Sequence, residues 1–404
     1  MNVLFLTIAF PQSFDHRNIH SDLMEEFAVN GHTVFVVCSR ERRHGKKSEL
    51  EESMGVKVLR LKTLNITSTT NWIEKGLAMV LLPYIMIKGI KKFFPGTDFD
   101  LVLYSTPPIT YDKVIKYLKR KYNPLTYLLL KDITPQNAVD LGVLNKGSLI
   151  WEYFRREEKL LYTLSDFIGC MSPANVKYLL NNNPQIPPAK VEICANSMRI
   201  RELEVLTDKD LLKTKYGIPT DKTVILYGGN LGKPQGISFL LDVLKANKGN
   251  SSIYFIIIGN GTEFNAIKEH IKYNNYSNVG LQDYIPKKEY NDILQISDIG
   301  LLFLDKRFTF PNFPTRVLDY MEYSLPIISA TDAVTDIGSI IESNDCGFGV
   351  LHGDIDSFQK RLQTLLAEEA LRKQMGNNAR ALFEKDYTTF KAYQTIINHC
   401  TNNN

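Results

Sequence analysis

A glycine-rich segment at 228–236, which reads Gly-Gly-Asn-Leu-Gly-Lys-Pro-Gln-Gly, contains residue types that bind phosphate. It follows an apolar run typical of a buried strand and precedes a helical pattern that begins at Ile237. Glycines let backbone N–H groups approach an anion closely, and the N-terminus of a helix attracts negative charge. A tight turn without a ligand is the alternative interpretation. The residues predicted to bind a phosphate group are Gly229, Asn230, Gly232 and the positively charged Lys233.

A second glycine turn, Gly259-Asn260-Gly261, follows the apolar run Phe255–Ile258. In an α/β domain the carboxyl ends of the parallel strands lie at one edge of the sheet, where ligands bind. Two glycine turns in one domain therefore favour a ligand crevice, and Gly259 and Gly261 are predicted to line it.

The segment 310–320 carries groups suited to a nucleotide diphosphate. Thr315 can cap a helix whose free N–H groups, together with Arg316, face a pyrophosphate. Asp319, one turn into that helix, can accept hydrogen bonds from ribose hydroxyls. Pro314 precedes the cap and completes the predicted binding segment. The alternative is a surface helix with an ordinary ion pair between Arg316 and Asp319.

The elements that must position these groups follow an α/β pattern, because short apolar runs alternate with helical periodicity. In the first half, strands are predicted at 3–8, 33–38, 56–61, 101–104, 126–130, 167–171 and 191–194. In the second half, they are predicted at 224–227, 254–258, 279–281, 299–304, 327–329 and 349–351. Helices are predicted at 20–30, from 237, at 355–385 and at 389–399.

The length of 404 residues, with 44% hydrophobic residues, predicts two domains of ordinary size. A charged, strand-poor stretch at 199–216 marks the predicted boundary. The N-terminal domain is predicted at 1–198 and the C-terminal domain at 199–385.

In order and spacing, these motifs resemble the retaining glycosyltransferases of the large family 4, which have GT-B architecture. The resemblance covers essentially the whole chain, and its most specific part runs from Pro314 to Pro326. The segment Lys131-Asp132-Ile133-Thr134-Pro135 is similar to a Lys/Arg-Asp-x-x-Pro segment of capsule and O-antigen enzymes related to N-acetylfucosamine transferases. The resemblance implies two facing Rossmann-like, doubly wound domains, with residues 386–404 crossing back to the N-terminal domain.

The family implies that the C-terminal domain holds a UDP-sugar donor and that the N-terminal domain holds the acceptor. Transfer is expected to retain the anomeric configuration and to need no cofactor and no metal. The sequence agrees with the last point, because no Asp-x-Asp pair stands at the end of a predicted strand. The charge on the departing diphosphate must then be neutralised by Lys233, Arg316 and backbone N–H groups.

Two positions depart from the family pattern. Pro311 stands where the first of two carboxylates is usual, whereas Asp319 aligns with the second. Lys131 stands where many relatives carry a histidine, and it is predicted to bring positive charge near the phosphates or the acceptor. His20 is a candidate substitute for that histidine, with a structural role as the alternative. Asp132 is predicted to orient the acceptor, with loop capping as the alternative.

The net charge of +4 excludes the dense basic surface of a dedicated nucleic-acid binder. The segment 72–94 is apolar, but charged residues and Pro83 interrupt it, which argues against a membrane span and favours peripheral contact with a membrane. A buried helix of the first domain is the alternative. The basic residues that support membrane contact are Lys88, Lys91, Lys92, Lys116, Lys119, Arg120 and Lys121.

Five scattered cysteines without metal-ligand spacing indicate reduced thiols in a cytoplasmic protein. The first residues lack the basic leader and cleavage site of a signal peptide. The predicted location is the cytoplasm, including peripheral attachment at the inner face of the cell membrane. A polyprenyl-diphosphate-linked glycan would be the acceptor there.

The leading hypothesis is a glycosyltransferase that moves a sugar, such as an N-acetylated deoxyhexose, from UDP to a lipid-linked glycan in surface polysaccharide biosynthesis. An epimerase on the same scaffold would bind a UDP-sugar but no lipid-linked acceptor. A non-catalytic sugar-nucleotide-binding scaffold is suggested by Pro311 and Lys131, which replace residues that the family usually conserves for the donor.

Overall fold

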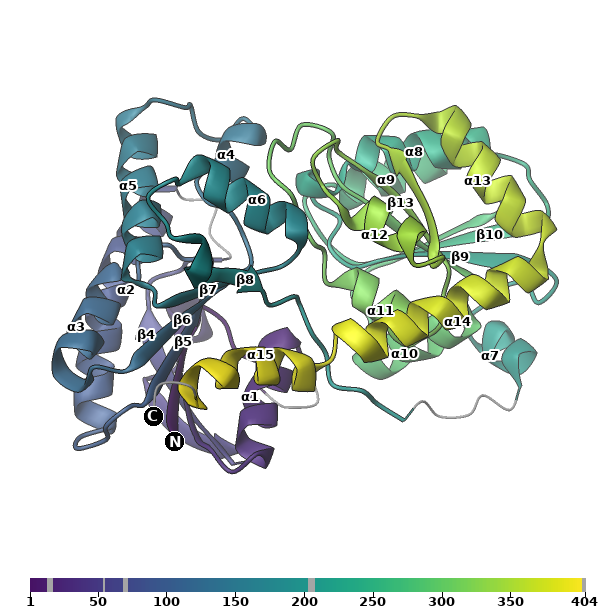
Figure 1. Ribbon diagram of the computed structural model, residues 1–404. Helices are drawn as coiled ribbons and strands as arrows, with labels where there is room; N and C mark the ends of the chain where they lie inside the picture. The colour runs from purple at the N-terminus through teal and green to yellow at the C-terminus, as the bar shows by residue number, and fades with distance from the viewer. Residues whose placement is uncertain (13–16, 54, 68–71, 203–207, 402–404) are drawn as a thin grey trace. The chain divides into compact units, whose positions relative to one another are not determined.

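The computed structural model describes residues 1–12, 17–53, 55–67, 72–202 and 208–401. The chain divides into two compact units, of which the first comprises residues 1–199 with 389–404 and the second comprises residues 200–388 (Figure 1). The sequence-based junctions at 198 and 385 fall close to these two divisions.

The first unit is built on an eight-stranded sheet in the order β3-β4-β2-β1-β5-β6-β7-β8. All neighbouring strands are parallel except β3 and β4. The strands are β1 Asn2–Leu6, β2 Thr33–Glu41, β3 Glu49–Ser53, β4 Val56–Thr63, β5 Leu101–Ser105, β6 Leu125–Leu130, β7 Phe167–Cys170 and β8 Val191–Ile193. Every strand predicted in this half is confirmed. The sequence analysis missed β3, whose residues Glu-Leu-Glu-Glu-Ser are mostly exposed at the sheet edge and lack the apolar signal of a buried strand.

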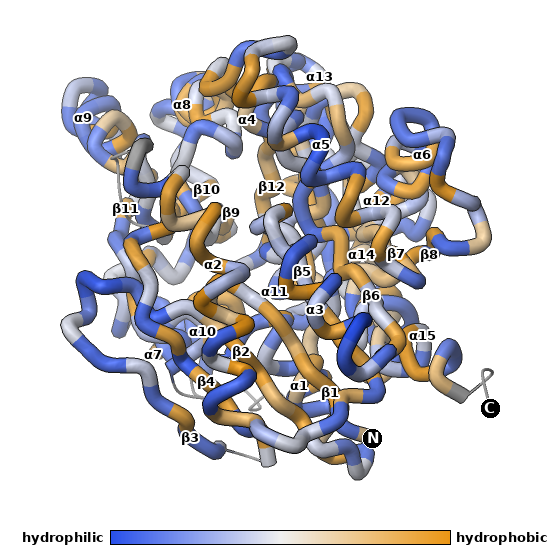
Figure 2. Tube along the Cα trace, turned by 90° about the vertical axis from the view of Figure 1, so that its left-hand side faces the viewer, coloured by the Kyte–Doolittle hydropathy of each residue, from blue (hydrophilic) through white to orange (hydrophobic). Residues whose placement is uncertain are grey.

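Helices cover both faces of this sheet (Figure 1). They are α1 Ile19–Val29, α2 Trp72–Phe93, α3 Asp112–Tyr122, α4 Gln136–Asp140, α5 Leu149–Leu164, α6 Pro173–Asn182 and α15 Thr389–Thr401. In β1, Leu4 and Leu6 join the core beneath α2 and α3, whereas Val3 and Phe5 join the core beneath α1 and α15. Burial on both faces explains why the strands are apolar runs without alternation (Figure 2).

The C-terminal helix α15 packs against α1, so the predicted return of the chain to the first unit is confirmed. Ile396 is fully buried in the core that α1 covers. The hydroxyl of Tyr393 and Nε2 of His32 lie 3.0 Å apart. The apolar stripe of α15 therefore completes one face of the first sheet.

The second unit is built on six parallel strands in the order β11-β10-β9-β12-β13-β14. They are β9 Thr223–Gly228, β10 Ile253–Ile258, β11 Val279–Gln282, β12 Ile299–Phe303, β13 Ile327–Thr331 and β14 Gly347–Leu351. The helices are α7 Lys209–Lys215, α8 Ile237–Ala246, α9 Phe264–Asn274, α10 Lys287–Ile296, α11 Arg316–Glu322, α12 Ile337–Ser343, α13 Ile355–Ala367 and α14 Glu369–Asp386. This is the doubly wound order, in which the strand order reverses between β9 and β12 and leaves a crevice at their carboxyl ends.

The predicted continuous helix at 355–385 is wrong, because Glu368 separates α13 from α14. The backbone of Glu368 has φ −117° and ψ 85°, which is not helical. Arg372 compensates for the break, since its Nη1 donates a hydrogen bond to the Leu366 carbonyl at 3.2 Å, near the end of α13.

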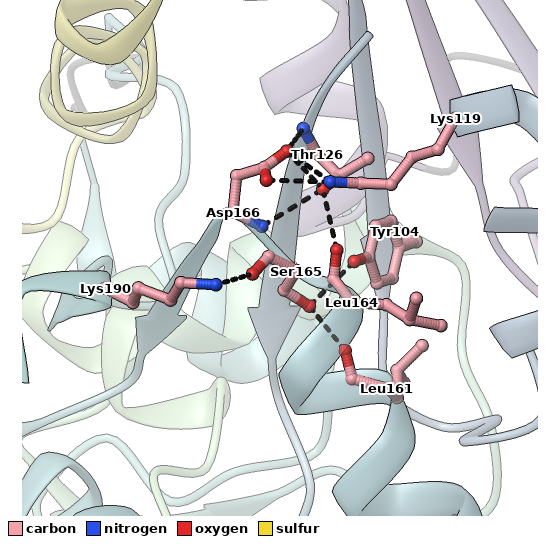
Figure 3. A network of polar contacts seen from close by, with 8 residues as sticks. All are labelled: Tyr104, Lys119, Thr126, Leu161, Leu164, Ser165, Asp166 and Lys190. Carbon is pink, nitrogen blue, oxygen red and sulfur yellow. Dashed lines mark hydrogen bonds and ion pairs between the residues drawn. The ribbon is translucent and has the colours of Figure 1, made fainter. Parts of the chain in front are cut away.

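A polar network connects α3, β5, β6 and the end of α5 in the first unit (Figure 3). Asp166 accepts hydrogen bonds from the Thr126 N–H at 2.9 Å and from the Thr126 hydroxyl at 2.7 Å, and it pairs with Lys119 at 2.7 Å. The Tyr104 hydroxyl lies 2.7 Å from the hydroxyl of Ser165. The network fixes the start of β6 against α3 and the end of α5, and β6 is the strand that leads to Lys131 and Asp132.

We expect Asp166→Ala to lower the melting temperature of the chain by about 3 °C or more, because the Thr126 N–H and the Lys119 ammonium lose their acceptor. Thermal denaturation followed by circular dichroism measures this. Glu52→Ala, which removes an exposed carboxylate of β3, is the control and should change the melting temperature little. Equal effects of the two substitutions would contradict the role given to the network.

Candidate functional site

A cavity of about 410 Å³ lies at the carboxyl ends of β9 and β10 in the second unit. Its lining includes Gly229, Asn230, Gly259, Pro314, Thr315, Arg316 and Asp319. All seven belong to the residues predicted to bind the nucleotide. The structure therefore brings together three motifs that are far apart in the sequence.

The other predicted residues lie outside this lining. Gly232 and Lys233 stand at the start of the short 3-10 helix Lys233–Gln235, where the Lys233 side chain is exposed. Gly261 packs against the backbone of Leu231, to which an added Cβ would come within 2.4 Å. The roles predicted for these three residues stay predictions.

The two glycine turns hold each other in place. The Gly229 N–H donates to the Ile258 carbonyl at 2.9 Å, and the Leu231 N–H donates to the Asn260 carbonyl at 2.8 Å. A Cβ on Gly259 would lie 1.7 Å from the Gly229 carbonyl oxygen. Gly259 is thus required by the contact between the two turns, whatever the ligand.

Arg316 is the dominant charge at this cavity. Its side chain is buried, and its guanidinium lies over the Tyr227 ring at 4.7 Å. Nη2 donates to the Asn230 carbonyl at 3.2 Å and to Gln235 Oε1 at 2.7 Å. Nη1 is buried without a hydrogen-bond partner. A buried cation that lacks a counter-ion is costly, and an anion bound in the cavity would remove that cost.

The alternative of an ordinary Arg316–Asp319 pair is wrong, because no carboxylate of the described chain lies within ion-pair distance of Arg316. Asp319 instead pairs with Lys287 at 2.9 Å. Lys287 also lines the cavity, and it was missed because a lysine at the start of a helix carries no distinctive sequence signal.

The capping role predicted for the Thr315 side chain is also wrong. Thr315 does precede the first residue of α11, but its hydroxyl makes no capping hydrogen bond. A capping side chain needs an extended backbone at the cap, whereas Thr315 has helical φ −64° and ψ −24°. Thr315 is exposed and lines the cavity.

The loop that contains Pro311 is held firmly although it lacks the first carboxylate of the family pattern. The Asn312 N–H donates to Thr335 Oγ1 at 3.1 Å, and the Thr335 hydroxyl donates to Asp332 Oδ2 at 2.8 Å. Burial raises the pKa of Asp332. This network was missed because it joins the segment before α11 to the loop after β13.

In the first unit, Lys131 and Asp132 follow β6 and point to different partners. Lys131 Nζ donates to the carbonyls of Cys194 at 3.1 Å and Ala195 at 3.2 Å, and burial lowers its pKa. Asp132 Oδ2 accepts a hydrogen bond from Asn137 Nδ2 at 2.7 Å. The two residues form no ion pair with each other, so each charge is available separately.

His20, in the first turn of α1, lies near Lys131. Burial, together with the positive charge of Lys131, lowers the pKa of His20 to about 3. The ring lies 5.1 Å from that of Phe5, and Nε2 is buried without a hydrogen-bond partner. The imidazole is therefore neutral at physiological pH. It can donate or accept a hydrogen bond, but it cannot supply positive charge.

Within the described residues, no group of three or more His, Cys, Asp or Glu side chains could hold a metal ion. The expectation of a metal-free site stays a prediction. No helix of the described chain is long and apolar enough to cross a membrane.

Asp132 gives a pH-dependent stability effect that can be measured. Burial raises its pKa from 3.8 to about 6. A raised folded-state pKa favours the folded chain at low pH, and this contribution is lost as the pH rises through 6. Asp132→Asn should therefore raise the melting temperature at about pH 7.5, and the gain should shrink as the pH falls toward 4.

The control for this measurement is Asp98→Asn, at an exposed carboxylate of the same unit. It should change the melting temperature little at any pH. A gain in Asp132→Asn that does not vary with pH would contradict the raised pKa.

Comparisons with known proteins find similar chains. Residues 208–382 match the family described as glycosyl transferases group 1. The probable glycosyltransferase WbjE of Pseudomonas aeruginosa is 22% identical over 321 residues, which cover 79% of this chain and 78% of that protein. The capsular polysaccharide biosynthesis glycosyltransferase CapM of Staphylococcus aureus is 23% identical over 255 residues, which cover 60% of this chain and 63% of that protein.

Solved structures share the fold over the whole chain. Sucrose-phosphate synthase from Thermosynechococcus elongatus has a TM-score of 0.76 at 15% identity, and the alignment covers 98% of this chain and 97% of that chain. Anabaena Alr3699/HepE in complex with UDP-glucose has a TM-score of 0.72 at 13% identity and covers 100% of both chains. The fold is thus the GT-B fold of glycosyltransferases, the chain is a glycosyltransferase, and its residues 208–382 match the glycosyl transferases group 1 family.

Proposed function

We propose that the chain transfers a sugar from a UDP-sugar to a lipid-linked glycan in the synthesis of a surface polysaccharide. The observation that carries the donor assignment is the buried Arg316, whose Nη1 has no partner and whose charge has no counter-ion at a cavity bordered by glycine turns. The diphosphate of a nucleotide sugar supplies the missing negative charge. UDP-glucose bound to Alr3699/HepE, which shares the fold, supports this class of donor.

The ribose, the base and the diphosphate of the donor can each be assigned to a part of the cavity. Asp319, held by Lys287, would accept hydrogen bonds from the ribose hydroxyls. Tyr284 and Ile285, which follow β11, also line the cavity and offer an apolar surface to the base. The diphosphate would lie between Arg316 and the turn at Gly229.

The proposed reaction retains the anomeric configuration. As the bond between the anomeric carbon and the phosphate oxygen breaks, negative charge grows on the diphosphate, and Arg316 with backbone N–H groups stabilises it. The leaving phosphate takes the proton of the acceptor hydroxyl, so no protein base is required. Asp132 would orient the acceptor, and Lys131 would add positive charge beside it.

A sugar of a surface polysaccharide is the proposed group transferred, because one relative, CapM, is named for capsular polysaccharide biosynthesis. An N-acetylated deoxyhexose remains the proposed sugar on the resemblance of residues 131–135. UDP-sugar epimerisation and nucleotide binding without catalysis are the competing functions, and both share the donor site.

UDP and UDP-sugars should raise the melting temperature of the chain with EDTA present, whereas GDP, CDP and ADP should not.

Arg316→Lys keeps the charge but loses the forked donor geometry, so kcat/KM for transfer should fall by about 100-fold or more. The matched control is Arg361→Lys, at a partly exposed arginine on α13, which should leave kcat/KM unchanged.

Each competing function predicts a different result in the same assay. NMR of the products distinguishes transfer with retention from inversion and from conversion of one UDP-sugar into another. No thermal shift with any nucleotide would sink the donor assignment, and a shift abolished by EDTA would contradict a metal-free site.

Helix α2 supports peripheral contact with a membrane. Its residues Ala78, Leu82, Met86 and Ile90 are buried in the core, as the buried-helix alternative expects. Its outer face is also apolar, because Leu77 and Tyr84 are each 52% exposed. An amphipathic helix of an ordinary domain has a polar outer face, so this apolar face needs another explanation.

The basic residues near this face are fewer than the sequence suggested. Lys88, Lys91 and Lys92 on α2 are exposed, and Lys113 of α3 lies over the Tyr84 ring at 4.7 Å. Lys119, in contrast, is held by Asp166 in the network of Figure 3. We propose that the apolar face of α2 enters the lipid headgroup region while these four lysines bind anionic lipid.

Sedimentation with vesicles that contain phosphatidylglycerol tests this surface. Wild-type protein should sediment with the vesicles and be released by salt, whereas Leu77→Ser with Leu81→Ser should sediment at least about threefold less. Val143→Ser with Leu149→Ser, which removes exposed apolar side chains outside α2, is the control. Equal losses in both variants would contradict the assignment to α2.

A further inference from the structure

The first unit contains a second cavity, of about 170 Å³, that the donor site does not use. It lies between the segment after β6, helix α5 and helix α6. Its lining includes Ile133, Pro135, Gln136 and Trp151, together with Arg155, Glu158, Tyr162 and the end of α6. Lys146, which is exposed, also lines the cavity.

The polar wall of this cavity is rigid. Arg155 Nη1 donates to Glu158 Oε2 at 2.6 Å, and the Tyr162 hydroxyl donates to Glu158 Oε1 at 2.7 Å. Arg155 Nη2 donates to the Asn182 carbonyl and to Asn183 Oδ1, each at 2.8 Å. Each oxygen of Glu158 can still accept a further hydrogen bond, so the wall offers acceptors in fixed positions.

Trp151 leaves a donor unused. Its Nε1 is buried and has no hydrogen-bond partner. A buried N–H without an acceptor costs roughly 1–3 kcal/mol, and native structures contain few such groups. An oxygen of a bound molecule would remove this cost.

The volume and chemistry of the cavity suit one sugar ring. A protein cavity of about 150 Å³ holds one benzene molecule, so a cavity of about 170 Å³ has room for one six-membered ring. Two aromatic side chains, Trp151 and Tyr178, and the apolar Ile133 and Leu179 can contact the C–H faces of such a ring. Acceptors on Glu158 and the donor on Trp151 match hydroxyls at its edge.

A free phosphate fits less well. The positive charge of Arg155 is already neutralised by Glu158, and both are largely buried. A second anion would therefore face the Glu158 carboxylate, and the other cation of the lining, Lys146, is exposed to solvent.

We propose that this cavity binds one pyranose ring of the acceptor glycan. The proposal rests on the proposed function, and it adds a subsite to the region around Asp132. Ile133 follows Asp132 directly, and Asn137 on α4, which donates to the Asp132 carboxylate, follows the cavity residue Gln136. A ring bound here would hold the rest of the acceptor beside Asp132.

The two tryptophans of the chain provide a direct test. In Trp72→Phe, Trp151 is the only tryptophan, and its fluorescence reports on the cavity. The probes are the methyl glycosides of glucose, galactose, mannose, fucose, N-acetylglucosamine and N-acetylfucosamine, each titrated to its solubility limit against the full chain. We expect a saturable change with at least one of them, and no saturable change with any would overturn the proposal.

A matched pair of variants ties that binding to the cavity. Trp151→Phe keeps the packing but removes the N–H donor, so the affinity for the responding glycoside, measured by saturation-transfer NMR, should fall by about two- to tenfold. Tyr153→Phe removes a hydroxyl from the same turn of α5, outside the cavity lining, and should leave the affinity unchanged. Equal affinities of wild type and Trp151→Phe would overturn the assignment.

Failure here is distinguishable from failure of the donor assignment. UDP should raise the melting temperature equally in wild type, Trp151→Phe and Tyr153→Phe, because the donor cavity lies in the other unit. A chain that binds UDP but no glycoside would keep the proposed function and lose the subsite.

Discussion

The buried guanidinium of Arg316 is the constraint on which the donor site depends. A full charge beneath the surface must be matched by an opposite charge or by hydrogen bonds, and here the Asn230 carbonyl and Gln235 satisfy only Nη2. The Tyr227 ring beneath the guanidinium adds a cation–π contact but no negative charge. The glycine turn that carries Asn230 is thereby tied to α11, so the site is assembled before any ligand arrives.

The strand order explains why both halves of the chain carry candidate residues at corresponding positions. In the second unit the order reverses between β9 and β12, and the turns after β9 and β10 border the donor cavity. In the first unit the order reverses between β1 and β5, and His20, Lys131 and Asp132 all follow carboxyl ends of nearby strands. Parallel sheets leave their ligand crevices at these ends, so one topology used twice supplies two separate sites.

The sequence predicted the parts that depend on local pattern. Apolar runs marked nearly every strand, and glycines marked the turns that border the donor cavity, because both signals arise from neighbouring residues. The charged edge strand β3, the break at Glu368 and the pairing of Lys287 with Asp319 were missed. Each depends on partners distant in the sequence or on exposure, which a local pattern does not encode. The predicted ion pair between Arg316 and Asp319 was wrong for the same reason, because tertiary packing buries Arg316 and pairs Asp319 with Lys287.

Lys131 and Asp132 are adjacent in the sequence, but their side chains bind different partners. Their opposite charges therefore do not neutralise each other. Had the two side chains paired, the carboxylate would have stayed ionised at low pH and the ammonium would have been neutralised locally. Instead, two carbonyls hold Lys131, and burial with one amide hydrogen bond leaves Asp132 with a pKa of about 6. Lys131 thus keeps an uncompensated positive charge close to the neutral His20, where it suits an anionic group. Asp132 lies instead beside the sugar-sized cavity, where a carboxylate that is readily protonated suits hydroxyl groups.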